Sequence, residues 1–172
     1  MTSVRILGVD PGSRYTGYGL IESDKGRSRL LAAGRLDVRE GTMAQRLLGV
    51  MNGLSEVIRA HAPHEAAVEE TFVNRVNAAS ALVLGQARGA AICACAQAGL
   101  EVSEYAAAQV KLAIAGNGRA DKDQVAHMVR VLLNTREKLA ADAADALAVA
   151  LTHAHVRTTL ARTGDALRRA WG

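Results

Sequence analysis

Four acidic residues lie at positions where the surrounding sequence predicts the protein interior. Asp10 and Glu69 each follow a short apolar run that is typical of a buried strand. Asp142 and Asp145 interrupt a segment rich in alanine and leucine, and their spacing of three places both on one face of a helix. A carboxylate in such surroundings is costly unless it is paired or binds a cation. The four acids together therefore predict one shared site.

The ligand atoms set the chemistry that such a site supports. Carboxylate oxygens without histidine or cysteine are the donors that Mg²⁺ prefers, and Mn²⁺ accepts the same set. Four carboxylates suit two ions about 3.5–4 Å apart, which can activate water on one side of a phosphorus and stabilise the leaving oxygen on the other. Crowded like charges repel one another, so the site should recruit cations. The acids thus predict metal-assisted hydrolysis of a phosphodiester bond.

Each acid taken alone also has an ordinary structural interpretation. Asp10 could be a turn residue that ends a strand. Glu69 has Glu70 beside it, and one of two adjacent acids at a strand end is often simply solvated. Asp142 could be a favourable charge in the first turn of a helix, and Asp145 could be exposed. The order strand–Asp, strand–Glu, helix–Asp-x-x-Asp is more specific than any one of its parts.

Hydrophobic periodicity indicates the elements that must position these acids. Three early strands should form an antiparallel meander, and later strands should alternate with helices. This order predicts an α/β fold with a five-stranded mixed sheet flanked by helices on both faces. The predicted strands are 4–9, 18–21, 29–38, 66–69 and 101–105, and the predicted helices are 43–61, 77–98, 107–115, 121–134 and 141–155. We expect a nuclease domain over residues 1–157 and a basic C-terminal tail over residues 158–172.

Composition limits the classes to which the protein can belong. With 172 residues, 49% of them hydrophobic and 22% charged, the chain should form one globular domain. A formal charge of +4 permits an anionic partner such as nucleic acid without requiring one. No stretch reaches the roughly 18 unbroken apolar residues of a membrane span, so we expect no membrane partner. Cys93 and Cys95 would diverge on a helix, which favours a reduced, cytoplasmic setting.

Several longer motifs run through nearly the whole chain. They are LGVDPGSRYTGYG at 7–19, VEETF at 68–72, ALVLGQARG at 81–89, EYAAAQVK at 104–111 and DAADALA at 142–148. In these segments the chain resembles the RuvC family of Holliday junction resolvases, which are members of the ribonuclease H-like superfamily. The resemblance fades beyond about residue 157.

This resemblance implies a ribonuclease H-like fold and a structure-specific endonuclease with an active site of Asp10, Glu69, Asp142 and Asp145. Some family members carry histidine where this chain has Asp142, so the all-carboxylate version is expected here. A homodimer would nick opposing strands near the crossover of a four-way junction, leaving 5′-phosphate and 3′-hydroxyl ends. The implied roles are homologous recombination and DNA repair, alongside the branch-migration proteins RuvA and RuvB.

The resemblance also implies contacts with DNA outside the four acids. Phe72, the single phenylalanine, would stack on a base opened at the junction, although it could instead be a core anchor. Lys111 and Lys122 match basic positions that would hold phosphate near the scissile bond, although both could be solvated surface residues. Weaker candidates for contacts with the DNA backbone are Arg75, Arg14 and Arg119.

The alanine- and glycine-rich helix predicted over 77–98 is our candidate for the dimer interface, although it could equally pack on its own sheet. Three other functions remain open. Asp10-x-Gly12 followed by Thr16 resembles the phosphate-binding hairpin of actin-like and sugar-kinase nucleotide binders, but that class needs two lobes. A junction-binding protein without catalysis would have no need of four convergent acids. A general ribonuclease H acting on hybrids is disfavoured only by the resemblance.

Overall fold

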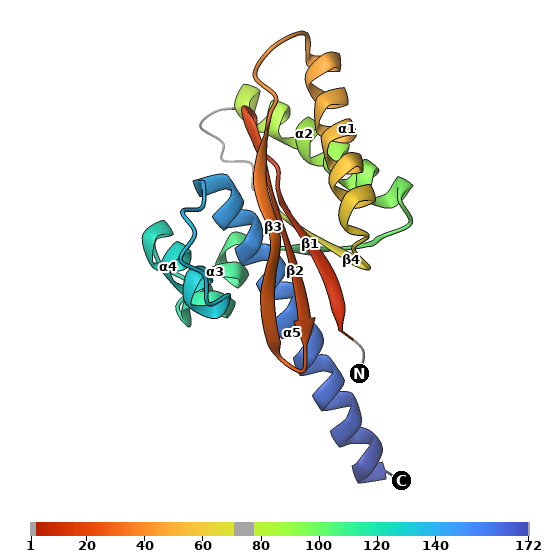
Figure 1. Cartoon of the computed structure of the whole chain (residues 1–172), viewed down its shortest axis with the longest axis vertical. Helices are drawn as coiled ribbons and strands as arrows, with labels where there is room; N and C mark the ends of the chain where they lie inside the picture. The colour runs from red at the N-terminus through yellow and green to blue at the C-terminus, as the bar shows by residue number, and fades with distance from the viewer. Residues whose placement is uncertain (1–2, 71–77, 172) are drawn as a thin grey trace.

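The computed structural model describes residues 3–70 and 78–171, and these form a single five-stranded sheet with helices on both faces (Figure 1). The strands are β1 (Val4–Asp10), β2 (Tyr15–Asp24), β3 (Arg27–Asp37), β4 (Glu65–Glu69) and β5 (Glu101–Tyr105). The helices are α1 (Met43–His61), α2 (Ala78–Gln97), α3 (Ala107–Ala115), α4 (Lys122–Leu132) and α5 (Ala141–Trp171). The predicted α/β class with a mixed sheet is confirmed.

The strands lie in the order β3-β2-β1-β4-β5. β1, β2 and β3 form the predicted antiparallel meander, whereas β4 pairs with β1 and β5 pairs with β4 in parallel. Parallel neighbours finish at the same edge of a sheet, so the C-terminal ends of β1, β4 and β5 lie together. In open sheets of this kind, ligand sites form beyond that edge.

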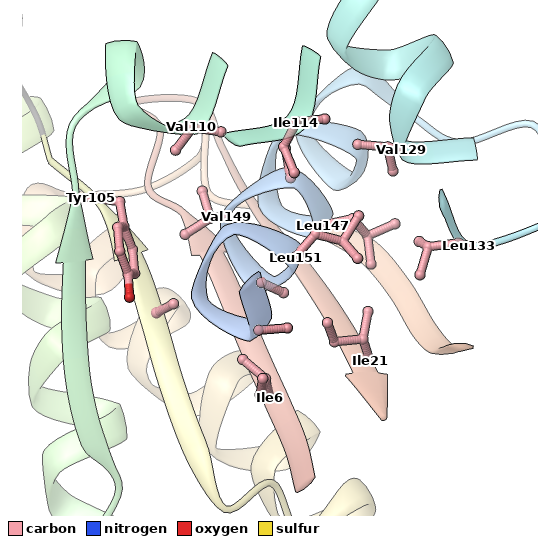
Figure 2. Packing of buried hydrophobic residues seen from close by; sticks show 14 of the residues in the cluster. Ile6, Ile21, Tyr105, Val110, Ile114, Val129, Leu133, Leu147, Val149 and Leu151 are labelled. Carbon is pink, nitrogen blue, oxygen red and sulfur yellow. The ribbon is translucent and has the colours of Figure 1, made fainter. Parts of the chain in front are cut away.

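Each face of the sheet has its own hydrophobic core. On one face, α1 and α2 pack over side chains that include Leu7, Leu20 and Val68. On the other face, α5 lies directly on the sheet and α3 and α4 pack beside it, with Leu147 and Leu151 at the centre (Figure 2). Alternate strand residues point to opposite faces, which is why both cores draw on the same short strands.

Two elements extend well beyond their predicted bounds. β2 begins at Tyr15 rather than residue 18, because it pairs with β1 as far as Asp10 and with β3 as far as Asp37. Glycines in this segment lower its strand propensity, and tertiary pairing overrides that local preference. α5 continues past residue 155 to Trp171, and its far end projects beyond the sheet (Figure 1).

Helix α2 packs against α1 through a buried stripe of small residues that ends in Cys95, whereas Cys93 is exposed. Both cysteines are free, and they diverge as predicted. By length and composition alone α2 would also be able to cross a membrane, which is weak evidence because core helices of soluble proteins pass the same test.

Candidate active site

Two of the four predicted acids meet at the C-terminal edge of the sheet. Asp10 is the last residue of β1 and Glu69 is the last residue of β4. The parallel register pairs Val9 with Val68, so these acids occupy equivalent positions on neighbouring strands. Strand pairing alone therefore brings together two acids that lie 59 positions apart in sequence.

Glycines in the sheet let helix α5 approach closely enough to add its own acids. A Cβ atom on Gly17, which pairs with Asp10, would lie 2.0 Å from the backbone oxygen of Asp142. A Cβ atom on Gly8 would lie 2.0 Å from the backbone oxygen of Ala146. The start of α5 therefore rests on bare backbone, and any other residue at these positions would push the helix away from the sheet.

The edge of the sheet and the start of α5 each form one wall of a cavity of ≈ 260 Å³. Asp10, Glu69 and Asp145 line this cavity together with Lys111 and Lys122. Its apolar walls come from Ala107, Val110, Val125 and Ala148. Three acids and two lysines from five different elements thus share one space, and the apolar walls strengthen the electrostatic interactions within it.

The cavity is electrostatically unbalanced toward negative charge. Burial, together with the nearby charges of Glu69 and Asp145, raises the pKa of Asp10 from 3.8 to about 8. Burial and the charge of Asp145 also raise the pKa of Glu69. Both shifts mean that the ionised carboxylates are poorly stabilised by the protein itself, so a cation in the cavity would be favoured.

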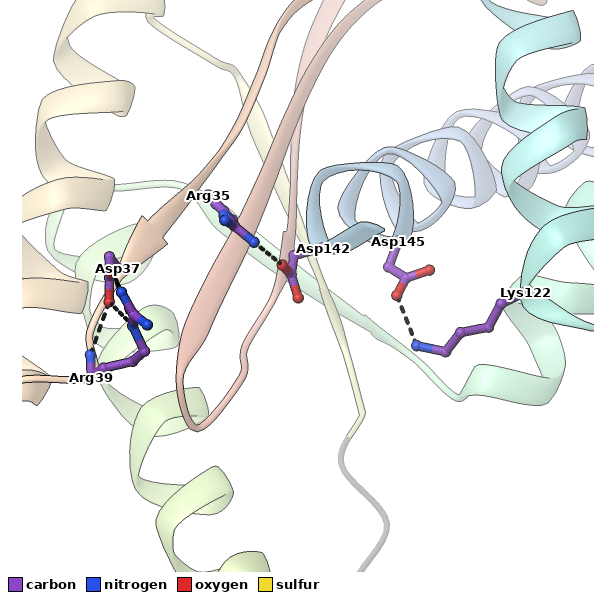
Figure 3. A network of polar contacts seen from close by, with 6 residues as sticks. All are labelled: Arg35, Asp37, Arg39, Lys122, Asp142 and Asp145. Atoms are coloured by element: carbon purple, nitrogen blue, oxygen red, sulfur yellow. Dashed lines mark hydrogen bonds and ion pairs between the residues drawn. The ribbon is translucent and has the colours of Figure 1, made fainter. Parts of the chain in front are cut away.

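Lys122 is the basic residue that most directly offsets this charge. Lys122 is the first residue of α4 and directly follows the N-cap residue Asp121, whose side chain accepts a hydrogen bond from the Gln124 backbone. Lys122 Nζ donates to Asp145 Oδ2 over 3.2 Å, and this contact raises the pKa of the lysine (Figure 3). The Lys122 side chain is 82% exposed, so it remains accessible to a phosphate at the mouth of the cavity.

Asp142 differs from the other three acids because it does not line the cavity. Figure 3 shows Asp142 and Asp145 leaving the start of α5 toward different partners. Asp142 Oδ2 lies 3.7 Å from Nη1 of Arg35, which is on β3. The negative charge of Asp142 also contributes to the raised pKa of Asp10. Asp142 therefore lies at the rim of the site, between Asp10 and Arg35.

Sequence reasoning missed Arg35. Its guanidinium also lies over the ring of Tyr15, with Cζ 4.1 Å from the ring centroid. Nothing local distinguishes Arg35 from the other arginines of its strand, but the register does, because Asp10 pairs with Gly17 and Gly17 pairs with Arg35. Only that row of three residues across three strands would have placed Arg35 beside the acids.

The remaining predicted DNA contacts lie away from the cavity or outside the described residues. Arg14 is exposed in the turn between β1 and β2, and Arg119 is exposed in the loop between α3 and α4. Neither lines the cavity. Phe72 and Arg75 fall within residues 71–77, which lie outside the described part of the chain.

The ligand atoms of this site suit a hard divalent cation by their chemistry, but the side chains are not placed to bind one. Its ligand atoms are carboxylate oxygens, and the raised pKa values of Asp10 and Glu69 indicate negative charge that a cation would stabilise. Within residues 3–70 and 78–171, however, no three Asp, Glu, His or Cys side chains are placed so that they could hold one metal ion. Metal binding would therefore require side-chain rotation around the cavity.

Comparison with known proteins agrees with the family resemblance that the sequence motifs indicated. A family model described as crossover junction endodeoxyribonuclease RuvC matches residues 6–153. The chain is 57% identical to RuvC from Halorhodospira halophila over 165 residues, covering 93% of this chain and 97% of that protein. It is 54% identical to RuvC from Xanthomonas campestris over 169 residues, covering 97% of each.

The fold agrees with these sequence matches. The solved structure of Thermus thermophilus RuvC in complex with Holliday junction substrate superimposes with a TM-score of 0.84 at 34% identity, covering 91% of this chain and 96% of that one. The ribonuclease H-like fold expected from the sequence is thereby confirmed. The chain belongs to the RuvC family of crossover junction endodeoxyribonucleases, the enzymes that resolve Holliday junctions.

Proposed function

We propose that this chain resolves four-way DNA junctions by hydrolysing one phosphodiester on each of two opposing strands, at a site built from Asp10, Glu69, Asp142 and Asp145. The observation that carries this proposal is the cavity in which three of these acids meet two lysines. A site that only bound DNA would gain nothing from acids that repel phosphate. A hydrolytic site needs them to hold cations beside the scissile bond.

Nucleases of this family depend on metal, and Mg²⁺, two ions per site, is the proposed cofactor, with Mn²⁺ able to substitute. When bound, the ions would supply Lewis acidity and an activated water. Asp10, at the centre, would contact both ions. Glu69 would hold one of them, and Asp142 and Asp145 would hold the other. Lys111 and Lys122 would hold the phosphate and offset charge that develops during cleavage.

The nucleotide-binding alternative conflicts with the position of Thr16. In a phosphate-binding hairpin its hydroxyl would have to reach a phosphate, yet the residue is 0% exposed and points into the interior. The described chain also forms one sheet rather than two lobes. We therefore favour DNA over a nucleoside triphosphate as the ligand.

The test is cleavage of a synthetic four-way junction compared with a linear duplex of the same sequence, with Mg²⁺ and with chelator. We expect paired, symmetric nicks in the junction alone, only with Mg²⁺, and with 5′-phosphate and 3′-hydroxyl ends that ligase can seal. Equal cleavage of the duplex would replace junction specificity with general nuclease activity. An intact junction in Mg²⁺ and in Mn²⁺ would overturn the proposal.

We also propose that two copies assemble through the exposed face of α2. Leu82 on this face is 67% exposed, and a Cβ atom on Gly85 or Gly89 would meet nothing within 4 Å. An apolar, small-residue face allows two helix backbones to approach closely, and a two-fold dimer would place equal sites on equivalent junction strands.

Changing Leu82 to aspartate should convert this dimer to monomer, because the new charge would be buried between two copies. The fold should survive, since Leu82 touches little of its own chain. Sedimentation equilibrium measures the change, and Leu112→Asp, at another exposed apolar position, serves as the matched control. A Leu82→Asp variant that remains dimeric would exclude this face as the interface.

We further propose that Phe72 stacks on an opened base, that Arg75, Arg14 and Arg119 contact the DNA backbone, and that the protein acts jointly with RuvA and RuvB. We likewise propose a cytoplasmic location and a functional boundary at residue 157.

A further inference from the structure

A second polar cluster lies on the same face of the sheet as the cavity and contains none of its residues. Glu65, Tyr105, His153 and Arg157 form this cluster, which we call the polar bridge. His153 Nδ1 lies 2.8 Å from the Tyr105 hydroxyl, and its Nε2 lies 2.8 Å from Glu65 Oε2. Arg157 Nε donates to Glu65 Oε1 over 2.9 Å. Both ring nitrogens of a neutral histidine protonated at Nε2 are satisfied by these contacts.

The histidine at the centre of the bridge is sheltered from solvent. The His153 side chain is 11% exposed, and its ring meets the edge of the Tyr105 ring at a centroid separation of 5.8 Å. Figure 2 shows Tyr105 near the tip of β5, with its hydroxyl directed back along the strand. Burial tends to raise the pKa of Glu65, but hydrogen bonds from His153 and Arg157 outweigh it and lower that pKa. The contacts are therefore strong ones.

The bridge joins the same two elements that carry Glu69 and Asp145. Glu65 and Glu69 are the two ends of β4, separated by roughly 13 Å of strand. His153 and Asp145 both lie on α5, separated by roughly 12 Å of helix. These lengths match, so contact at the Glu65 end determines which residues meet at the Glu69 end.

Packing against β1 and β2 also holds α5 on the sheet. The helix meets these strands at Gly8 and Gly17, where backbone rests on backbone, and at Gly19, where the side chain of Leu147 lies. These contacts bring helix and sheet close together. The bridge adds a set of short, directional hydrogen bonds that restrain how far α5 is displaced along its axis.

We propose that the polar bridge is a positioning device for the active site, in which His153 and its partners set the axial position of α5 and so the separation of Glu69 and Asp145. This inference rests on the proposed function of those two acids. Tyr105 strengthens the connection, because its backbone oxygen accepts a hydrogen bond from the Glu70 backbone, directly after Glu69. Bridge and acids are thus linked along β4, β5 and α5.

The bridge has two arms, which are the contact of His153 Nδ1 with Tyr105 and the contact of its Nε2 with Glu65. Asparagine and glutamine at position 153 each retain a different one of these contacts. Asparagine places a polar atom near the former Nδ1 but cannot reach Glu65, whereas glutamine reaches to the former Nε2. We measure Mn²⁺ affinity of the DNA-free protein by electron paramagnetic resonance, and the single-turnover rate on bound junction in Mg²⁺. His153→Asn should weaken Mn²⁺ binding and slow cleavage about 10- to 100-fold, because small displacements of ligands have effects of that size. His153→Gln should recover most of both.

Controls distinguish positioning from general destabilisation. His155→Asn changes a histidine on the same helix that is outside the bridge and should behave as wild type. Thr152→Val removes a buried hydroxyl that donates to the Ala148 backbone, and it should lower the melting temperature without removing a bridge contact. Junction binding in chelator should be unchanged in every variant.

Three results would overturn the positioning role. The first is wild-type Mn²⁺ affinity and cleavage rate in His153→Asn. The second is an equal loss of Mn²⁺ affinity and rate in Thr152→Val at an equal fall in melting temperature, and the third is a His153→Gln variant as impaired as His153→Asn. Should His153→Asn not fold, Tyr105→Phe removes one oxygen from the other arm and should act in the same direction. A wild-type protein that binds Mn²⁺ but leaves junctions intact would refute the proposed function, while the Mn²⁺ measurement would still decide the bridge.

Discussion

Replacing Asp10 with asparagine should abolish junction cleavage while leaving junction binding intact or tighter. Asp10 is the most deeply buried of the acids with a raised pKa, and every other acid of the site contributes to that shift. An amide has similar shape but cannot supply the anionic oxygen that holds a cation. We expect a loss on the order of 10³-fold or more in single-turnover rate. Binding, measured by gel shift in chelator, should not fall, since one negative charge facing phosphate is removed.

The same variant should change how stability depends on pH in metal-free protein. The pKa of Asp10 is about 8 in the folded chain against 3.8 for the free side chain, so the folded state holds the extra proton between these values. The contribution of Asp10 to stability is therefore greatest at the acidic end and falls as pH rises from about 4 to about 8. Asp10→Asn should flatten this decline and exceed the wild type in melting temperature near neutrality.

Mg²⁺ provides the control for this interpretation. A cation bound among the acids stabilises the wild type by mass action, and it should do so less in Asp10→Asn. Melting temperatures in chelator and in Mg²⁺ across the same pH range test both statements. Parallel pH profiles for the two proteins, together with an undiminished rate of cleavage, would show that Asp10 is not part of the site.

Replacing Gly8 with alanine should strongly destabilise the fold, although it adds only one methyl group. The new Cβ would lie 2.0 Å from the backbone oxygen of Ala146 and 2.8 Å from the backbone nitrogen of Ala150. Neither atom can rotate away, so α5 must move off the sheet. We expect a loss of about 3 kcal/mol or more in the free energy of unfolding. Urea denaturation measures it, and cleavage should fall as well because Asp145 moves with the helix.

Gly49→Ala is the matched control. Gly49 is exposed in the middle of α1, and an added Cβ would meet only Val38 Cγ1, at 3.8 Å. Alanine is favoured over glycine inside a helix by roughly 1 kcal/mol, so this variant should be neutral or slightly stabilised. Similar stability losses at both positions would mean that α5 does not rest on Gly8 as described.

The elements that carry the acids could be predicted from sequence because their signals are local. Apolar runs ending at Asp10 and Glu69 marked β1 and β4, and the helical spacing of Asp142 and Asp145 marked the start of α5. The mixed sheet followed from the order of these elements. What the sequence indicated least well was β2, where glycines that weaken strand propensity are required for the close approach of α5.

The partners of these acids were not predictable in the same way. Arg35 reaches Asp142 only through the register of three strands, and His153 reaches Glu65 across 88 positions of sequence. From sequence, His153 had no feature to set it apart from the other histidines of the chain. Non-local side-chain contacts depend on distances that no residue pattern encodes, so they emerge only once the sheet and α5 are in place.

The central position of α5 also has a consequence for the chain as it emerges from the ribosome. Asp10 is made long before Asp145, and α5 then has to dock into a core that lacked it. A truncated product ending before α5 would expose the apolar face of the sheet and carry no complete set of acids. A potentially harmful DNA-cutting activity is thereby confined to molecules in which α5 has been made and has docked on the sheet.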